Sequence, residues 1–150
     1  MSLKTRITDD MKAALKARQS QRLSAIRLLL AAIQQKEIDE RKDLSDGEAV
    51  GVVEKLIKQR RDSIAQFQAA NRSDLADAET FELGVLSSYL PKQVTDAEVT
   101  TEVDNAVLET GAKSLADMGK VMGALKVRLA GKADMSKVSA LVRAKLGAGA

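Results

Sequence analysis

The acidic side chains between residues 74 and 82 are of a type that could carry out acid–base or metal chemistry. Asp74, Asp77, Glu79 and Glu82 fall in this short stretch, and neighbouring carboxylates can act as general acid and base or hold a hard cation. The chain contains no histidine and no cysteine, which excludes Ser-His-Asp and Cys-His nucleophiles and histidine-ligated zinc or di-iron sites. Acidic residues also stabilise the positive end of a helix dipole. We therefore interpret this run as a solvated helix start and expect no catalytic residue, metal site or cofactor.

Two of these carboxylates are predicted to have a structural role. Glu79 and Glu82 lie deeper in the helix than the aspartates and are expected to pair with Arg60 or Arg61 on a neighbouring helix. Arg60 falls within the apolar stripe of its own helix, which suggests an internal ion pair. The run Lys58–Arg61 looks like a nucleic-acid patch, but consecutive residues point around a helix and not to one side. The structural interpretation is therefore favoured.

The last third of the chain carries positive charge that is not balanced locally. Residues 94–117 contain one lysine and six acidic residues, a net charge of −5, whereas residues 118–150 contain seven lysines and arginines and a single acid, a net charge of +6. Adjacent basic helices can present a positive face to a phosphate backbone. The candidate RNA-binding residues are Lys120, Lys126, Arg128, Lys132, Lys137 and Arg143.

A second interpretation of this basic surface stays open. The same cations can dock on the acidic helix expected at residues 96–110, in which case they are not free to meet a ligand. The glycines at 119, 123 and 131 leave room for close approach, either of a neighbouring helix or of a polyanion. The sequence alone does not separate these alternatives.

The elements that must hold these residues are all helices. The chain has 150 residues, of which 45% are hydrophobic and only 2% aromatic, so its core must be built from Leu, Val, Ile and Ala. Apolar residues recur at helical spacing, and no alternation typical of a strand persists. The spacing predicts helices at residues 2–18, 20–42, 45–69, 71–90, 96–110, 114–131 and 134–146.

These helices are expected to form two parts joined at Pro91. Pro91 lacks an N–H and disfavours helical geometry at the residue before it, so it ends the fourth helix. The predicted fold is all-α, with a four-helix bundle-like subdomain at residues 1–93 and a three-helix subdomain at residues 94–150. The expected helix caps are Ser2, Ser20, Ser45 with Glu48, Asn71 or Ser73, Thr95 with Glu98, Gly111, Ser114 and Asp134.

No segment of the sequence predicts contact with a membrane. The longest apolar run, residues 28–33, is far shorter than the roughly 20 residues that cross a bilayer. The N-terminus lacks the apolar stretch of a secretory signal peptide. We therefore expect a cytoplasmic location and no membrane partner.

Three segments of the chain resemble one known family. They read NRSDLADAETFELGVLSSYLPKQ, KQRRDSIAQFQAANRSDL and MGKVMGALKVRLAGKADMSKVSALVRAKL. Together they cover most of residues 22–146, and they resemble the GatB/YqeY family, in particular its small free-standing members. The segment from Thr95 to Leu146 is similar to the tail domain of the B subunit of Asp/Glu-tRNA amidotransferases.

This resemblance implies a function without catalysis. In the family the helical tail helps to hold the body of the tRNA, while other domains perform carbon–nitrogen ligation with glutamine as amido-N-donor. The large catalytic domain has no counterpart in this chain, so we expect no ligase activity from it alone. The leading hypothesis is an accessory protein that binds tRNA or another structured RNA through charge and shape.

Two other hypotheses remain beside it. The chain can serve as a protein–protein adaptor in translation through an apolar groove or the acidic helix, or as a non-catalytic component of an amidotransferase-like complex.

The aromatic residues bear on the kind of RNA that the chain can bind. All three lie in apolar stripes, which leaves no stacking platform for single-stranded bases.

Overall fold

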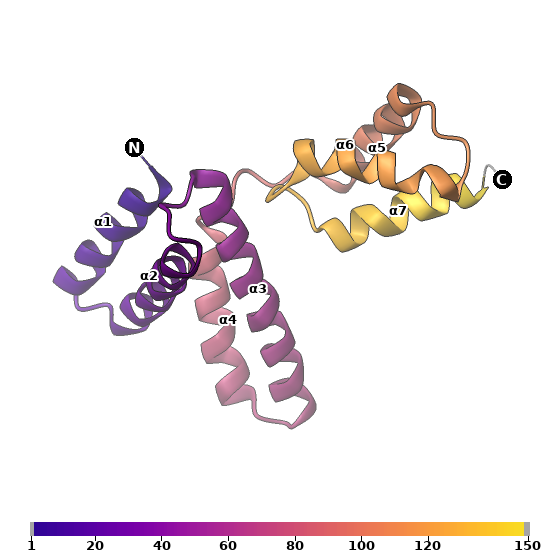
Figure 1. Cartoon of the computed structure of the whole chain (residues 1–150). Coiled ribbons are helices and arrows are strands. Elements are labelled where there is room, and N and C mark those ends of the chain that lie inside the picture. Colours follow the sequence, from indigo (N-terminus) through magenta and orange to yellow (C-terminus); the bar gives the residue numbers. More distant parts are fainter. Residues whose placement is uncertain (1, 149–150) are drawn as a thin grey trace. The chain divides into compact units, whose positions relative to one another are not determined.

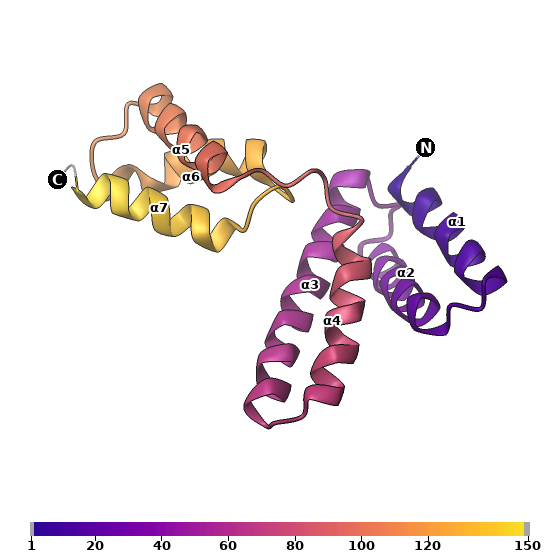
Figure 2. The same ribbon diagram turned by 180° about the vertical axis from the view of Figure 1, so that it is seen from behind.

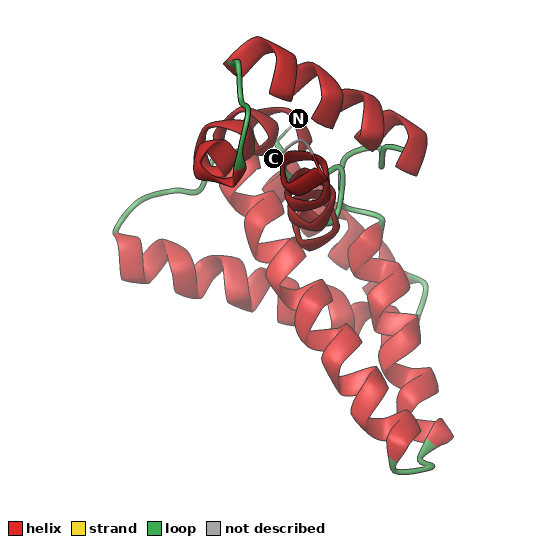
Figure 3. Ribbon diagram, turned by 90° about the vertical axis from the view of Figure 1, so that its right-hand side faces the viewer, coloured by secondary structure: helices red, strands yellow, loops and turns green. Residues whose placement is uncertain are grey.

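The computed structural model describes residues 2–148, and every regular element in this range is a helix (Figure 3). The predicted all-α class is confirmed. The chain divides into two compact units, one ending at Leu90 and the other beginning at Pro91. In order, the elements are α1 (Leu3–Lys16), α2 (Ser20–Glu40), α3 (Asp46–Ala69), α4 (Ser73–Ser87), α5 (Asp96–Thr110), the 3₁₀ helix η1 (Leu115–Asp117), α6 (Met118–Leu129) and α7 (Met135–Ala148).

The N-terminal unit contains α1 to α4 around one aliphatic core. Helices α3 and α4 lie side by side and form a long antiparallel hairpin (Figures 1 and 2). Branched aliphatic side chains dominate the interior, because four helices without large aromatics must interdigitate small residues. The largest fully buried side chains of this unit are Ile7, Ile26, Leu29, Ile33 and Val53.

Tyr89 fastens the end of α4 to α1. Its hydroxyl donates to a carboxylate oxygen of Asp10 at 2.7 Å, and the ring is 2% exposed. The Arg6 guanidinium lies 5.1 Å from the centre of the ring and donates to the Ser88 carbonyl at 3.0 Å. Burial, together with the bond to Asp10, raises the pKa of the phenol above its ordinary value. This cluster joins residues far apart in the chain, so no local sequence pattern predicts it.

Several predicted caps are present in the structure. The Ser2 hydroxyl accepts from the Thr5 N–H, and the Thr95 hydroxyl accepts from the Glu98 N–H. Gly111 adopts φ of 65° at the end of α5, a conformation that favours glycine. These caps depend only on residues close in sequence, which is why the pattern predicts them.

Three predicted helix starts were wrong or incomplete. Ser20 is the first residue of α2 and Gln19 occupies its cap without a side-chain bond. Neither Asn71 nor Ser73 caps α4: Asn71 turns the chain with φ of 57°, and Arg72 precedes the helix. Ser114 does cap a helix, but the helix is η1, which precedes α6. A short polar residue is thus no guarantee of a cap, because the turn that fits the packing decides where the helix begins.

The C-terminal unit packs α5, α6 and α7 around a second aliphatic core. The Asp134 carboxylate accepts from the Ser136 N–H at 2.9 Å and caps α7, as predicted. The buried side chains of the C-terminal core are Val99, Val103, Ala106, Val121, Leu125, Leu129, Val138, Val142 and Leu146.

Arg60 forms the internal ion pair predicted between α3 and α4. Its Nε lies 3.3 Å from a carboxylate oxygen of Glu79 and 2.9 Å from one of Glu82. The Arg60 Nε and the Glu79 oxygen are both buried atoms without a well-directed hydrogen bond, so the attraction is chiefly Coulombic. Of the two arginines considered from the sequence, Arg60 is the one that pairs.

Removing the Arg60 side chain should destabilise the N-terminal unit. Arg60→Ala leaves two neighbouring carboxylates without their cation, and we expect a loss of about 1 to 3 kcal/mol of unfolding free energy. Arg61→Ala, one residue away and exposed, is the control and should change stability by less than about 0.5 kcal/mol. Urea unfolding measures both, and equal losses would contradict the structural role of Arg60.

The predicted capping box at the start of α3 is also present, and it includes the charged carboxylate of Glu48. The Glu48 carboxylate accepts from the Ser45 N–H and hydroxyl and pairs with Lys42 at 2.7 Å. Lys42, followed by the two Ser45 groups, lowers the pKa of Glu48 from 4.5 to about 2.

Acid should remove the contribution of Glu48 to stability. Because its pKa is lower in the folded state, the contribution is complete above pH 4.5 and is lost as the pH falls toward about 2. We expect Glu48→Gln to lower the melting temperature by a few degrees at neutral pH and much less near pH 2. A difference from wild type that does not depend on pH would show that the carboxylate charge is irrelevant.

Candidate nucleic-acid interface

The six candidate RNA-binding residues come from three consecutive segments of the C-terminal unit. Lys120, Lys126 and Arg128 lie on α6, Lys132 lies in the turn after it, and Lys137 and Arg143 lie on α7. All are exposed except Arg128, which is half-buried. The structure does not bring all six to one face. Lys126 and Arg128, two positions apart, are separated by about 200° around α6 and point to opposite sides.

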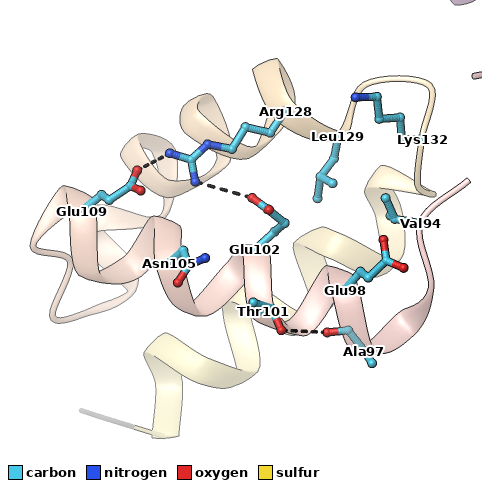
Figure 4. Close-up of a pocket in the computed structure, with 10 residues that line it drawn as sticks. All are labelled: Val94, Ala97, Glu98, Thr101, Glu102, Asn105, Glu109, Arg128, Leu129 and Lys132. Carbon is cyan, nitrogen blue, oxygen red and sulfur yellow. Dashed lines mark hydrogen bonds and ion pairs between the residues drawn. The ribbon is translucent and has the colours of Figure 1, made fainter. Parts of the chain in front are cut away.

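Arg128 is engaged inside the unit. Its guanidinium binds Glu109 and lies 3.5 Å from a carboxylate oxygen of Glu102, both on α5 (Figure 4). The pKa of Arg128 is raised, and the hydrogen bond to Glu109 is the largest cause. Arg128 therefore belongs to the contact between α5 and α6, and it is not a free cation.

The opposite flank of α5 holds a second cation. Lys145 of α7 forms an ion pair with Asp104, which lies two positions from Glu102 and so points to the other side of α5. The alternative in which the basic helices dock on the acidic helix is therefore correct for Arg128 and Lys145. Within residues 2–148, no ion pair involves the other five candidates.

An open hollow of about 740 Å³ lies between α5 and the end of α6. Arg128 crosses it toward Glu109, and Leu129 and Val94 form part of its apolar lining (Figure 4). Its polar lining includes the carboxylates of Glu102 and Glu109 that bind Arg128, and Lys132 lies at its edge (Figure 4). The lining residues are Val94, Ala97, Glu98, Thr101, Glu102, Asn105, Glu109, Arg128, Leu129 and Lys132.

Two lysines flank a glycine on the outward side of α6. Lys120 and Lys126 are three residues before and after Gly123, so they are its neighbours on the helix surface on opposite sides. A Cβ added at Gly119 or Gly123 meets no atom within 4 Å. These glycines therefore do not serve the packing of a neighbouring helix of this unit, and Gly123 leaves the α6 backbone uncovered between the two lysines.

The acidic residue Asp117 lies near Lys120. The Asp117 carboxylate accepts from the N–H groups of Lys113 and Ser114 at 2.9 and 3.3 Å. These two bonds lower its pKa, with smaller contributions from the charges of Lys120 and Lys113. Asp117 is thus committed to the turn before α6, and its distance from Lys120 exceeds that of an ion pair.

The acidic run that could have carried chemistry is dispersed. Asp74 pairs with Arg72 at the surface, and Glu79 and Glu82 face Arg60. Across the described ranges, no three side chains of metal-binding type lie close enough to hold an ion. None of the described helices is long and apolar enough to cross a bilayer.

Gln93 contributes to this end of the unit, although its role was not predicted from the sequence. The Gln93 amide donates to the Gly131 carbonyl at 2.7 Å, in the turn that carries Lys132. The neighbouring Val94 N–H donates to the Lys132 carbonyl at 3.0 Å. No local pattern predicts contacts across so many residues, although a glutamine two residues after the chain's single proline was a visible signal.

Comparison with known proteins identifies relatives over most of the chain. A protein of Lachancea thermotolerans named altered inheritance of mitochondria protein 41, mitochondrial, is 39% identical over 103 residues, which cover 67% of this chain and 55% of the relative. Its namesakes in Kluyveromyces lactis and Saccharomyces cerevisiae (strain YJM789) are 40% identical over 84 residues and 32% identical over 113 residues. These matches cover 55% and 75% of this chain, and 45% and 61% of the relatives. The chain spans about half the length of the curated relatives it matches.

The names of these relatives correct one expectation. The predicted cytoplasmic location is wrong by this comparison, since the relatives are named as mitochondrial proteins. That prediction rested on the lack of an apolar signal, which does not distinguish the cytosol from organelles whose import signals are amphipathic. The model of the Yqey-like protein family matches residues 4–146, and the chain therefore belongs to that family.

Proposed function

We propose that this protein binds structured RNA, and tRNA in particular, through the cations of its C-terminal unit that are left unpaired. Binding uses charge and shape, without base readout and without catalysis. The observation that carries the proposal is the division of the positive charge: α5 engages Arg128 and Lys145, while Lys120, Lys126, Lys132, Lys137 and Arg143 form no ion pair within the described residues.

The outward side of α6 is the best-suited part of this surface. Lys120 and Lys126 flank the uncovered backbone at Gly123, and a glycine there permits a phosphate chain to approach closely between two positive charges. A glycine within a helix costs about 1 kcal/mol relative to alanine. The packing of this unit does not require glycine at positions 119 and 123, because a Cβ there meets no atom within 4 Å. Close approach of a ligand to the helix backbone would require it.

The adaptor hypothesis receives less support. Three carboxylates of α5, those of Glu102, Asp104 and Glu109, are already paired with cations of the same unit. An acidic docking face on α5 would have to compete with these pairs. The RNA hypothesis requires no such exchange.

Replacing the unpaired lysines should weaken RNA binding in a salt-dependent way. Lys120→Gln with Lys126→Gln removes two phosphate contacts, so we expect about tenfold weaker binding of unfractionated tRNA at low salt and a salt slope lower by about two. Fluorescence anisotropy across a salt series measures both quantities.

The control for net charge uses a cation that is already engaged. Lys145→Gln removes one positive charge from the same unit, but from a residue paired with Asp104, and should leave tRNA affinity within about twofold of wild type. If Lys120→Gln, Lys126→Gln and Lys145→Gln, each made alone, weaken binding equally, only net charge matters and the proposed surface is wrong. If wild type shows no salt-dependent binding, the proposed function itself fails.

Adding a methyl group at Gly123 should separate stability from binding. Because nothing lies within 4 Å of the new Cβ, Gly123→Ala should raise unfolding free energy by about 0.5 to 1 kcal/mol. It should also weaken tRNA binding, since the methyl group holds the phosphate chain away from the helix.

Gly84→Ala on α4 is the matched control. Its added Cβ also meets no atom within 4 Å, so it should stabilise the protein similarly and leave binding unchanged. Unaltered affinity in Gly123→Ala would show that the α6 backbone is not approached.

A further inference from the structure

The turn between α6 and α7 has a defined conformation. Gly131 adopts φ of 74°, in the left-handed region that favours glycine. The Lys132 N–H donates to the Leu129 carbonyl at 2.9 Å, which closes the turn on the end of α6. The side chain of Lys132 is exposed and, within residues 2–148, makes no ion pair.

Residues that precede α5 fasten this turn from outside. The Gln93 Nε2 donates to the Gly131 carbonyl at 2.7 Å and to the Pro91 carbonyl at 2.9 Å. The Val94 N–H donates to the Lys132 carbonyl at 3.0 Å. Two successive residues thus hold two successive carbonyls of the turn, one through a side chain and one through the backbone.

We propose that Gln93 is a positioning residue for polyanion binding, which acts by holding the backbone of Lys132 in place. This inference rests on the proposed RNA binding. A lysine on a loose turn loses conformational freedom when it binds a phosphate, and that loss lowers affinity. A turn that is already held in place has less freedom to lose, so binding costs less entropy. Gln93 itself carries no charge and need not touch the ligand.

Binding of unfractionated tRNA tests the role through a double-mutant cycle. Gln93→Ala should weaken binding about threefold at low salt, by loosening one phosphate contact. In a Lys132→Ala background the same change should have no further effect, because the residue that Gln93 positions is gone. Asn105→Ala, an exposed amide on α5 for which no hydrogen bond is present among the described residues, is the control and should bind like wild type. An equal loss from Gln93→Ala in both backgrounds would overturn the proposal.

Hydrogen exchange supplies a readout that does not depend on RNA. Gln93→Ala should speed exchange of the Val94 amide, which bonds to the Lys132 carbonyl, and leave amides in the middle of α5 protected. An unchanged exchange rate of the Val94 amide would overturn the positioning role of Gln93 even if wild type binds tRNA. Faster exchange in a protein that binds no tRNA would instead refute the proposed function, and the positioning role with it.

Discussion

The carboxylates of α5 determine which positive charges of the C-terminal unit remain available. Glu102 and Glu109 lie seven residues apart on one flank of the helix and share Arg128, while Asp104 on the other flank holds Lys145. Because α5 binds cations from both neighbouring helices, these two basic side chains are directed toward α5. The remaining charge is left on the outward side of α6, on the turn at Lys132 and on α7.

These ion pairs orient the helices more than they stabilise them. The side chains of these pairs are 34% to 56% exposed, and such pairs contribute little net free energy in water. Stability comes instead from the two aliphatic clusters, whose burial removes apolar area from solvent. This separation lets the charged residues be arranged for contact with a ligand at little cost to folding. Arg60 is the exception, since it lies between two carboxylates in a more buried place.

Much of the helical architecture could be predicted, because it depends on local rules. The apolar spacing indicated helices close to the observed ones, and Ser45 with Glu48, Thr95 and Gly111 act as local chemistry predicts. The turns at Arg18, Arg41 and Asn71 escaped prediction, since each puts a residue other than glycine at positive φ. Packing of the adjoining helices overrides the residue preference at these positions.

The candidate site was less accessible to prediction than the fold. Composition indicated where the positive charge lies along the chain, but not which cations are paired. Arg128 and Glu109 are 19 residues apart, and Lys145 and Asp104 are 41 apart, so each pairing depends on how three helices cross. The same holds for Gln93 and Gly131, whereas the neighbours of Gly123 on α6 follow directly from helix periodicity.

The setting of Tyr89 has a consequence for spectroscopy. It is the chain's sole tyrosine, and there is no tryptophan, so ultraviolet emission arises almost wholly from the N-terminal unit. A buried phenol that donates to a carboxylate emits differently from one in water, and the signal should change when α1 detaches from the end of α4. Circular dichroism, by contrast, reports on the helices of both units. The two signals together can therefore show whether the units melt in one step or two.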